Sequence, residues 1–134
     1  MADYKYVIPQ IPPSNNKFIG RNARFDYNNQ KKEWQRMIFL LCRPAPEKPI
    51  DKAIVHITYY FPDKRRRDPD NYSGKFILDG LVRAGILTDD DFSHITLRLS
   101  GKYDKANPRT EISIIEENEN VQQSYTNGSH RKRP

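Results

Sequence analysis

The chain has few of the residues that build covalent cross-links or membrane anchors. It contains one cysteine, Cys42, so it cannot form an internal disulfide, and a reducing compartment is expected. Cys42 ends an apolar run, which favours packing as a small hydrophobe over a role as a nucleophile. No apolar run approaches the about 20 residues of a membrane-spanning helix, and no signal peptide is visible. We therefore expect a soluble, cytoplasmic protein with no membrane contact.

Length and charge limit the fold and the choice of partner. With 134 residues, the chain is long enough for one domain with its own core. Its formal net charge of +6 favours an acidic partner such as nucleic acid or an anionic surface. Internal repeats are absent, and no apolar periodicity remains after Glu116. We predict a folded domain over residues 1–116 and a disordered polar tail over residues 117–134.

Hydrophobic periodicity predicts an α+β fold. Four segments are typical of strands: Tyr4–Ile11, Ala53–Phe61, His94–Ser100 and Arg109–Ile115. Prolines close the first, which suits a sheet edge, whereas the second is apolar on both faces and is expected to be central. The last two follow a short connection and are expected to form an antiparallel pair. Helices are predicted from Asn28 or Asn29 to Cys42, with Trp34 as a core anchor, and over Asn71–Gly85. The prediction is a single domain with a mixed sheet packed by two main helices.

Most residues that could carry chemistry lie between Lys64 and Phe92. Four consecutive cations, Lys64–Arg67, are followed at once by Asp68 and Asp70, and a short amphipathic segment then leads to Asp89–Asp91. Cations attract a polyanion, whereas clustered acids repel one unless a divalent metal lies between them. A phosphodiester substrate bridged to the acids by Mg²⁺ explains this order. The alternative is a solvated charge run, with Asp70 as the N-cap of a helix.

Two familiar metal motifs do not fit the Asp-Pro-Asp segment. An EF-hand loop starting at Asp68 needs an oxygen ligand and then glycine at its fifth and sixth positions, where this chain has Tyr72 and Ser73. A phosphatase with a nucleophilic aspartate places its acids at the end of an apolar strand, but four cations intervene here. A divalent-metal site made from Asp68, Asp70 and one acid of residues 89–91 remains. A metal-bound water could then attack phosphorus, and Lys75 could steer it.

A polar loop near the N-terminus is a second candidate for phosphate contact. Its sequence from residue 12 to 17 is Pro-Pro-Ser-Asn-Asn-Lys, and further cations follow. Proline and asparagine are common in turns, so the loop could be purely structural. Amide side chains next to cations also suit phosphate binding. The side chains that would make such contacts are Asn15, Asn16, Lys17 and Arg21.

Together these motifs resemble the RusA family of Holliday junction resolvases. The resemblance covers roughly Tyr4 to Glu116. Its motifs are Pro12–Asn16, Arg65–Asn71, Lys75, Leu78-Asp79, Ala84-Gly85 and Asp89-Asp90. It implies a RusA-like fold and a homodimeric endonuclease that depends on Mg²⁺ or Mn²⁺. Such an enzyme would nick four-way DNA junctions symmetrically, in DNA recombination and repair.

The resemblance also suggests a role for each matching residue. It implies that Asp68, Asp70 and Asp90 are the catalytic carboxylates and metal ligands and that Lys75 is the catalytic lysine. Asp89 is the next choice for the third metal ligand.

The expected DNA contacts are Lys64, Arg65, Arg66 and Arg67, with the four loop residues Asn15, Asn16, Lys17 and Arg21. Two alternative functions are a non-catalytic binder of branched DNA and a metal-dependent phosphohydrolase of small substrates.

Overall fold

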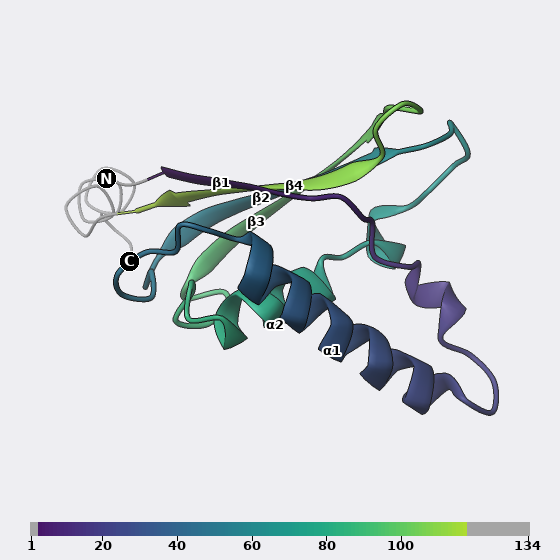
Figure 1. The fold of residues 1–134 in the computed structure, drawn as a ribbon, viewed down its shortest axis with the longest axis horizontal. Coiled ribbons are helices and arrows are strands. Elements are labelled where there is room, and N and C mark those ends of the chain that lie inside the picture. Colours follow the sequence, from purple (N-terminus) through teal and green to yellow (C-terminus); the bar gives the residue numbers. More distant parts are fainter. Residues whose placement is uncertain (1–2, 118–134) are drawn as a thin grey trace, which may run out of the picture.

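The computed structural model describes residues 3–117, which form one sheet covered on one face by two helices (Figure 1). The strands are β1 (Asp3–Ile8), β2 (Ala53–Phe61), β3 (Ile95–Tyr103) and β4 (Arg109–Glu116). The helices are α1 (Ala23–Leu41) and α2 (Lys75–Arg83), with two short 3-10 helices, η1 (Asn15–Lys17) and η2 (Pro69–Asn71). The predicted α+β class with a mixed sheet and two main helices is confirmed. The predicted tail begins at residue 117, and residues 118–134 lie outside the described part.

The strand order is β1-β4-β2-β3, which places β2 inside the sheet as predicted. β2 is antiparallel to β4 on one side and parallel to β3 on the other. β1 lies at an edge and ends at Ile8, directly before Pro9. Proline has no N–H to donate to a strand ladder, so it suits the end of an edge strand.

The predicted antiparallel pair of the last two strands is wrong. β3 and β4 run in opposite directions, but β2 lies between them. The connection from Asp104 to Pro108 passes the end of β2, where the Asp104 N–H donates to the Phe61 carbonyl at 2.8 Å. A short connection favours a hairpin. In the structure, however, β2 lies between β3 and β4, because this central position buries the apolar residues on both of its faces.

The core lies between the sheet and the two helices. Its largest fully buried side chains include Trp34 and Ile38 of α1, Ile77 and Leu81 of α2, and Ile8, Val55, Ile57, Ile112 and Ile114 of the strands. Trp34 is thus the core anchor that the sequence predicted. The helices pack so closely that a Cβ on Gly80 would lie 2.6 Å from Cδ1 of Ile38. Glycine at position 80 therefore permits this helix contact.

Cys42 is also buried in this core, and burial raises the pKa of its thiol to about 12. The thiol is therefore protonated near neutral pH, which agrees with the packing role predicted for it.

α1 begins earlier than predicted, at Ala23. Its first turns are held by Tyr27, whose ring lies 5.4 Å from that of Phe18 and 5.0 Å from that of Phe76. Among residues 3–117, no helix is long and apolar enough to cross a membrane.

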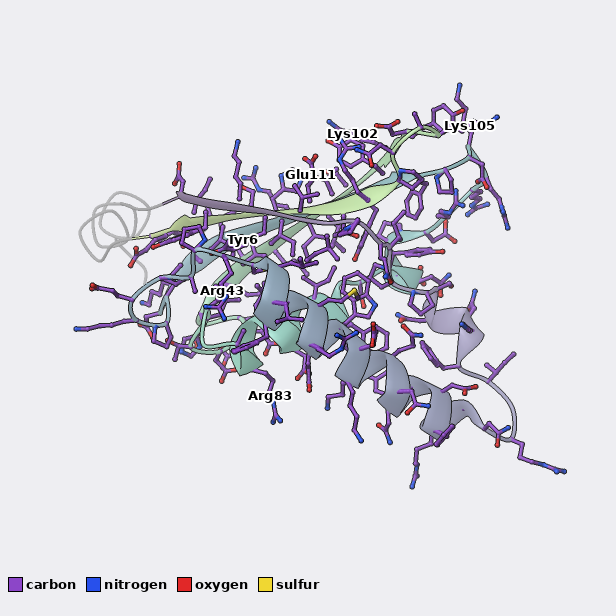
Figure 2. All side chains as sticks on the ribbon, viewed as in Figure 1. Tyr6, Arg43, Arg83, Lys102, Lys105 and Glu111 are labelled. Carbon is purple, nitrogen blue, oxygen red and sulfur yellow. The ribbon has the colours of Figure 1, made fainter. Side chains whose placement is uncertain are left out.

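The face of the sheet away from the helices carries mostly polar and charged side chains, with Val7 and Ile115 exposed among them. Figure 2 shows Lys102 and Glu111 on this side of the sheet. His56 forms a 2.8 Å hydrogen bond with the Ser100 hydroxyl on the neighbouring strand. The helices therefore cover the apolar face of the sheet, and the other face is open.

One buried hydrogen bond ties β4 to the chain just beyond β1. The hydroxyl of Thr110, which is fully buried, donates to the Gln10 carbonyl at 2.6 Å. Thr110→Val keeps the shape but removes the donor, so we expect the free energy of unfolding to fall by about 1 kcal/mol. Urea unfolding measures the change. Thr96→Val on exposed β3 is the matched control and should change stability by less than about 0.5 kcal/mol. Equal effects of the two variants would contradict a role for the Gln10 contact.

Candidate functional site

The segment between β2 and α2 is held in place by Arg67. The side chain of Arg67 is only 14% exposed, and its guanidinium lies 2.9 Å from Oδ1 of Asp63. The same group stacks over the Phe61 ring, 4.3 Å from the ring centroid, and donates to the carbonyls of Asp63 and Arg65. The backbone N–H and the side chain of Arg65, followed by Arg67, hold the pKa of Asp63 below its usual value. Arg67 therefore anchors the basic run to the end of β2.

The other three cations of the run are exposed. Lys64 lies over the Tyr103 ring, 5.1 Å from its centroid. Arg65 pairs with Asp63 at 3.1 Å, and Arg66 pairs with Oδ1 of Asp68 at 3.2 Å, while the two arginine side chains are 76% and 89% exposed. Ion pairs this exposed contribute about 0–1 kcal/mol. Arg65 and Arg66 can therefore exchange these partners for a phosphate at low cost.

The Asp-Pro-Asp segment meets the N-terminal polar loop. Asp68 immediately precedes η2, and Asp70 lies within it. Nδ2 of Asn15, in η1, donates to the backbone carbonyl of Asp70 at 3.0 Å across 55 positions of sequence. A hollow of about 410 Å³ lies at this meeting point. Its lining residues are Ser14, Asn16, Arg65, Arg66, Arg67, Asp68, Asn71 and Tyr72. The structure thus brings together two motifs that the sequence could only consider separately.

The interpretation of Asp70 as the N-cap of the second helix is wrong. α2 begins at Lys75, later than predicted, and its N-cap is Gly74, whose φ of 82° lies in the left-handed region that favours glycine. Asp68 precedes η2, yet its side chain makes no capping hydrogen bond there. Within residues 3–117, the carboxylate of Asp70 has no hydrogen-bond or ion-pair partner. Helix capping therefore does not explain this acid pair.

Lys75 is exposed at the first turn of α2. Its Nζ lies 5.3 Å from the centroid of the Tyr27 ring, which holds the lysine by a cation–π contact. Asp79 lies one turn further on, at a spacing that permits a surface ion pair with Lys75. Among residues 3–117 that pair is not formed, and Asp79 instead accepts a 2.8 Å hydrogen bond from Nε2 of Gln35 in α1. Lys75 therefore has no carboxylate partner in the described part of the chain.

The second group of acids, Asp89–Asp91, lies in the turn between α2 and β3. Partial burial, and then the neighbouring charge of Asp89, raise the pKa of Asp90 above its usual value. The charge of Asp79 adds to this rise, so Asp90 lies within electrostatic reach of α2. Asp79 belongs to the Leu78-Asp79 motif of the family resemblance, but it was not identified from the sequence as a site residue. Its position one turn after Lys75 was the available signal.

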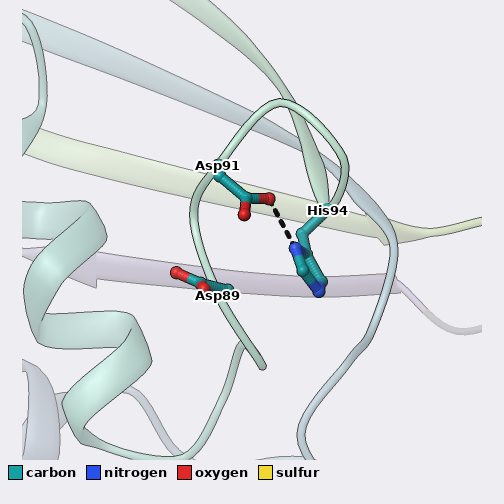
Figure 3. A group of neighbouring side chains, drawn as sticks. All are labelled: Asp89, Asp91 and His94. Carbon is teal, nitrogen blue, oxygen red and sulfur yellow. Dashed lines mark hydrogen bonds and ion pairs between the residues drawn. The ribbon is translucent and has the colours of Figure 1, made fainter.

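His94 joins the same turn, although sequence reasoning assigned it no role there. Figure 3 shows the Asp91 carboxylate turned toward the His94 ring, and Oδ1 of Asp91 lies 2.5 Å from Nδ1 of His94. This hydrogen bond lowers the pKa of Asp91 and raises that of His94. Asp89, Asp91 and His94 each place one donor atom within 4.8 Å of the others. Asp68, Asp70 and Asp90 are not in this group.

The remaining predicted contact residues lie around η1. Ser14 caps η1 by accepting a hydrogen bond from the Asn16 N–H at 3.2 Å. Lys17 ends η1, and Arg21 lies just before α1. Both of these cations are exposed. They add positive charge to the surface of the loop that reaches Asp70.

A comparison with known protein families covers the segments described above. A family model described as endodeoxyribonuclease RusA matches residues 8–115. The match includes the polar loop, the basic run, both acid groups and Lys75. A search of curated proteins gave no match. Because the match covers most of the chain, it shows that the protein is a nuclease, which is a hydrolase of phosphodiester bonds. The chain belongs to the RusA endodeoxyribonuclease family, which acts on branched DNA junctions.

The Asp91–His94 contact predicts how the histidine titrates. Asp91→Asn removes the charge and the strongest acceptor, so the pKa of His94 should fall toward its ordinary value. Asp51→Asn should lower it less, because Oδ1 of Asp51 lies 3.7 Å from Nε2 and contributes after Asp91. An NMR titration of the His94 ring measures both variants, with Asp104→Asn as a distant control. Equal shifts in Asp91→Asn and Asp51→Asn would contradict the described geometry.

Proposed function

We propose that the protein is a structure-selective DNA endonuclease that resolves four-way junctions by paired symmetric nicks, assisted by Mg²⁺ or Mn²⁺. The observation that carries the proposal is the hydrogen bond from Asn15 to the Asp70 carbonyl. Through it, the η1 loop meets the Asp-Pro-Asp segment beside a hollow lined by amide side chains, exposed arginines and Asp68. The family match supports the same function. A role in DNA recombination and repair would follow from this substrate.

The acids offer the oxygen ligands that a hard divalent cation prefers. Asp68 has only the weak, exposed pair with Arg66, and Asp70 has no side-chain partner within residues 3–117. The raised pKa of Asp90 indicates that its negative charge is poorly compensated, and a nearby cation would correct this. Mg²⁺ needs only one or two carboxylates, because it retains waters and binds substrate oxygens. When bound, such an ion would supply a more acidic water and positive charge beside the phosphate. We propose Asp68, Asp70 and Asp90 as its ligands, with Asp89 as the alternative third ligand.

The chain's own residues would bind and orient the DNA backbone. Arg65 and Arg66 are exposed enough to contact phosphates, as are Lys64 and the η1 loop. Arg67 has its guanidinium occupied by Asp63 and Phe61, so its part is to hold the run in place. Lys75 is held over Tyr27 and is free of carboxylates in the described chain, which leaves its charge available to developing negative charge on the phosphate.

Neither alternative function fits this arrangement as well. A non-catalytic DNA binder gives the acids only a structural role, yet Asp70 caps no helix in the described chain. A phosphohydrolase of small substrates calls for an enclosed pocket, whereas the hollow at Asp68 is bordered by exposed arginines. Such an open cationic border suits a polymer of phosphates.

A homodimer would match the symmetry of the substrate. A four-way junction has approximate two-fold symmetry, and two strands must be cut to resolve it. Two surfaces are candidates for the interface: the outer face of β2 and the first helix. On β2, the Tyr60 ring is covered by Arg109, whose guanidinium carbon lies 3.8 Å from the ring centroid. The end of α1 instead exposes Phe39, Leu40 and Leu41. We therefore propose that the C-terminal end of α1, at Phe39, Leu40 and Leu41, forms the dimer contact.

The proposal predicts the behaviour of Asp70→Asn on a supercoiled cruciform plasmid. The wild-type protein should release linear DNA directly with Mg²⁺, because two nicks fall within one bound lifetime. Loss of partners outside the ligand shell already costs about 10–100-fold in metal sites, so loss of a proposed ligand should lower the rate by about 100-fold or more. Junction binding should persist, since one negative charge facing phosphate is removed. Gel analysis of the plasmid and a junction-binding assay measure both effects.

Asp26→Asn is the matched control, because Asp26 is an exposed aspartate of α1 outside the proposed site. It should cut like the wild type. Full activity of Asp70→Asn would refute its role as a ligand. A monomeric mass by light scattering, together with nicked circles as the main early product, would refute paired cutting.

The proposed phosphate contacts predict a change in salt dependence. Removing one phosphate contact should reduce the slope of log K against log salt by roughly 0.9, so replacing both Arg65 and Arg66 by alanine should reduce it by up to about 1.8. Arg36→Ala is the control, since Arg36 is an exposed arginine of α1 that pairs with Glu33. Fluorescence anisotropy on a junction across a salt series gives the slopes. An unchanged slope in the double variant would show that these arginines do not contact phosphate.

A further inference from the structure

Phe92 is the most exposed large apolar side chain in residues 3–117. Its relative exposure is 105%, compared with 67% for Phe25 of α1. Burying a phenylalanine side chain contributes roughly 1.5–3 kcal/mol, and Phe92 realises none of this within the described chain. It directly follows Asp91 and lies two residues from Asp90, a proposed metal ligand.

The turn around Phe92 is anchored on both sides. The N–H and hydroxyl of Ser93 donate to Oδ1 of Asp91 at 3.1 and 2.8 Å. The N–H groups of His94 and Ile95 both donate to the Asp91 carbonyl at 3.1 Å, and the Ala53 N–H donates to the His94 carbonyl at 2.9 Å. Ile95 is buried and begins β3. The turn is therefore fixed to β2, and the outward position of Phe92 is part of the fold.

We infer that Phe92 stacks on a nucleobase exposed at the branch point of the junction, next to the phosphate that is cut. This inference rests on the proposed function, since Asp90 must lie near that phosphate. Neighbouring nucleotides of one strand are only about 3.4 Å apart along the helix axis, so a base close to the bound phosphate falls within reach of a side chain two residues away. The base is also an uncharged partner, which the surrounding acids do not repel.

Stacking on a branch-point base would distinguish a junction from a continuous duplex. In a duplex, each base pair is covered on both faces by its neighbours, whereas base pairs at a branch point can present an open face. Apolar side chains such as phenylalanine can be inserted between base steps. Aromatic stacking tolerates every base because each has a flat face. Phe92 would thus add selectivity for DNA shape without requiring a particular sequence.

The test compares Phe92→Ala and Phe92→Trp with Phe25→Ala, all in the Asp70→Asn background so that bound junctions stay uncut. We expect Phe92→Ala to bind a junction roughly 5- to 100-fold more weakly and to bind a linear duplex unchanged. Phe92→Trp should retain junction affinity, and Phe25→Ala should behave like the parent. A junction with 2-aminopurine at the branch point reports stacking directly. Its emission should change on binding to the parent and to Phe92→Trp, but not to Phe92→Ala.

The outcomes separate this inference from the proposed function. If the wild type cuts junctions but Phe92→Ala keeps both its junction preference and the 2-aminopurine signal, the inference is wrong and the proposed function stands. A wild type that neither binds nor cuts junctions overturns both. A lower oligomeric mass of Phe92→Ala by light scattering would show that Phe92 contacts a second copy of the chain, which also overturns the inference.

Discussion

The parallel pairing of β2 with β3 is the constraint on which the candidate site depends. The two strands pair along their whole length, from Ala53 opposite Ile95 to Phe61 opposite Tyr103. Parallel neighbours cannot be joined by a tight turn, so the chain must cross back over the sheet. That crossover, residues 62–94, carries the basic run, both acid groups and α2. A contiguous stretch of charged sequence is therefore spread around one short helix on the covered face of the sheet.

Close packing against β2 fixes this crossover along its path. The Tyr72 ring lies 5.8 Å from that of Tyr59 and 5.1 Å from that of Phe61, which secures the chain after η2. A Cβ on Gly74 would lie 2.8 Å from Cδ1 of Ile57, so only glycine lets α2 begin this close to the strand. The Tyr59 hydroxyl is buried here without a partner in the described chain, and burial raises its pKa. The segment that carries Asp68 and Asp70 is therefore held against the aromatic side chains of β2 through Tyr72.

The features of the fold that depend on local sequence pattern could be predicted. Those that depend on competition between distant segments for the same neighbour could not. The central position of β2 and the core role of Trp34 follow directly from apolar periodicity. The pairing of β3 does not, because it depends on which neighbour buries β2 best, and a short connection points to the wrong partner. Sequence pattern places the start of α2 at Asn71 rather than Lys75, because a left-handed glycine leaves little trace in a polar segment. The Asn15–Asp70 contact joins positions 55 residues apart and has no local signature.

The cations and acids of the crossover neutralise one another only weakly, and this has a physical consequence for binding. Arg66 contacts Asp68 only through Nε, at 3.2 Å from Oδ1, so moving its whole guanidinium onto a phosphate would free Oδ1 of Asp68 for a cation. An anion that draws Arg66 away frees Asp68 for a cation, and a cation on Asp68 frees Arg66 for an anion. Binding of the anion and binding of the cation therefore favour one another at this pair. The cost of the exchange is small, because an ion pair this exposed contributes about 0–1 kcal/mol. Arg67, largely buried over Phe61, does not share this freedom and keeps the segment in place while its neighbours exchange partners.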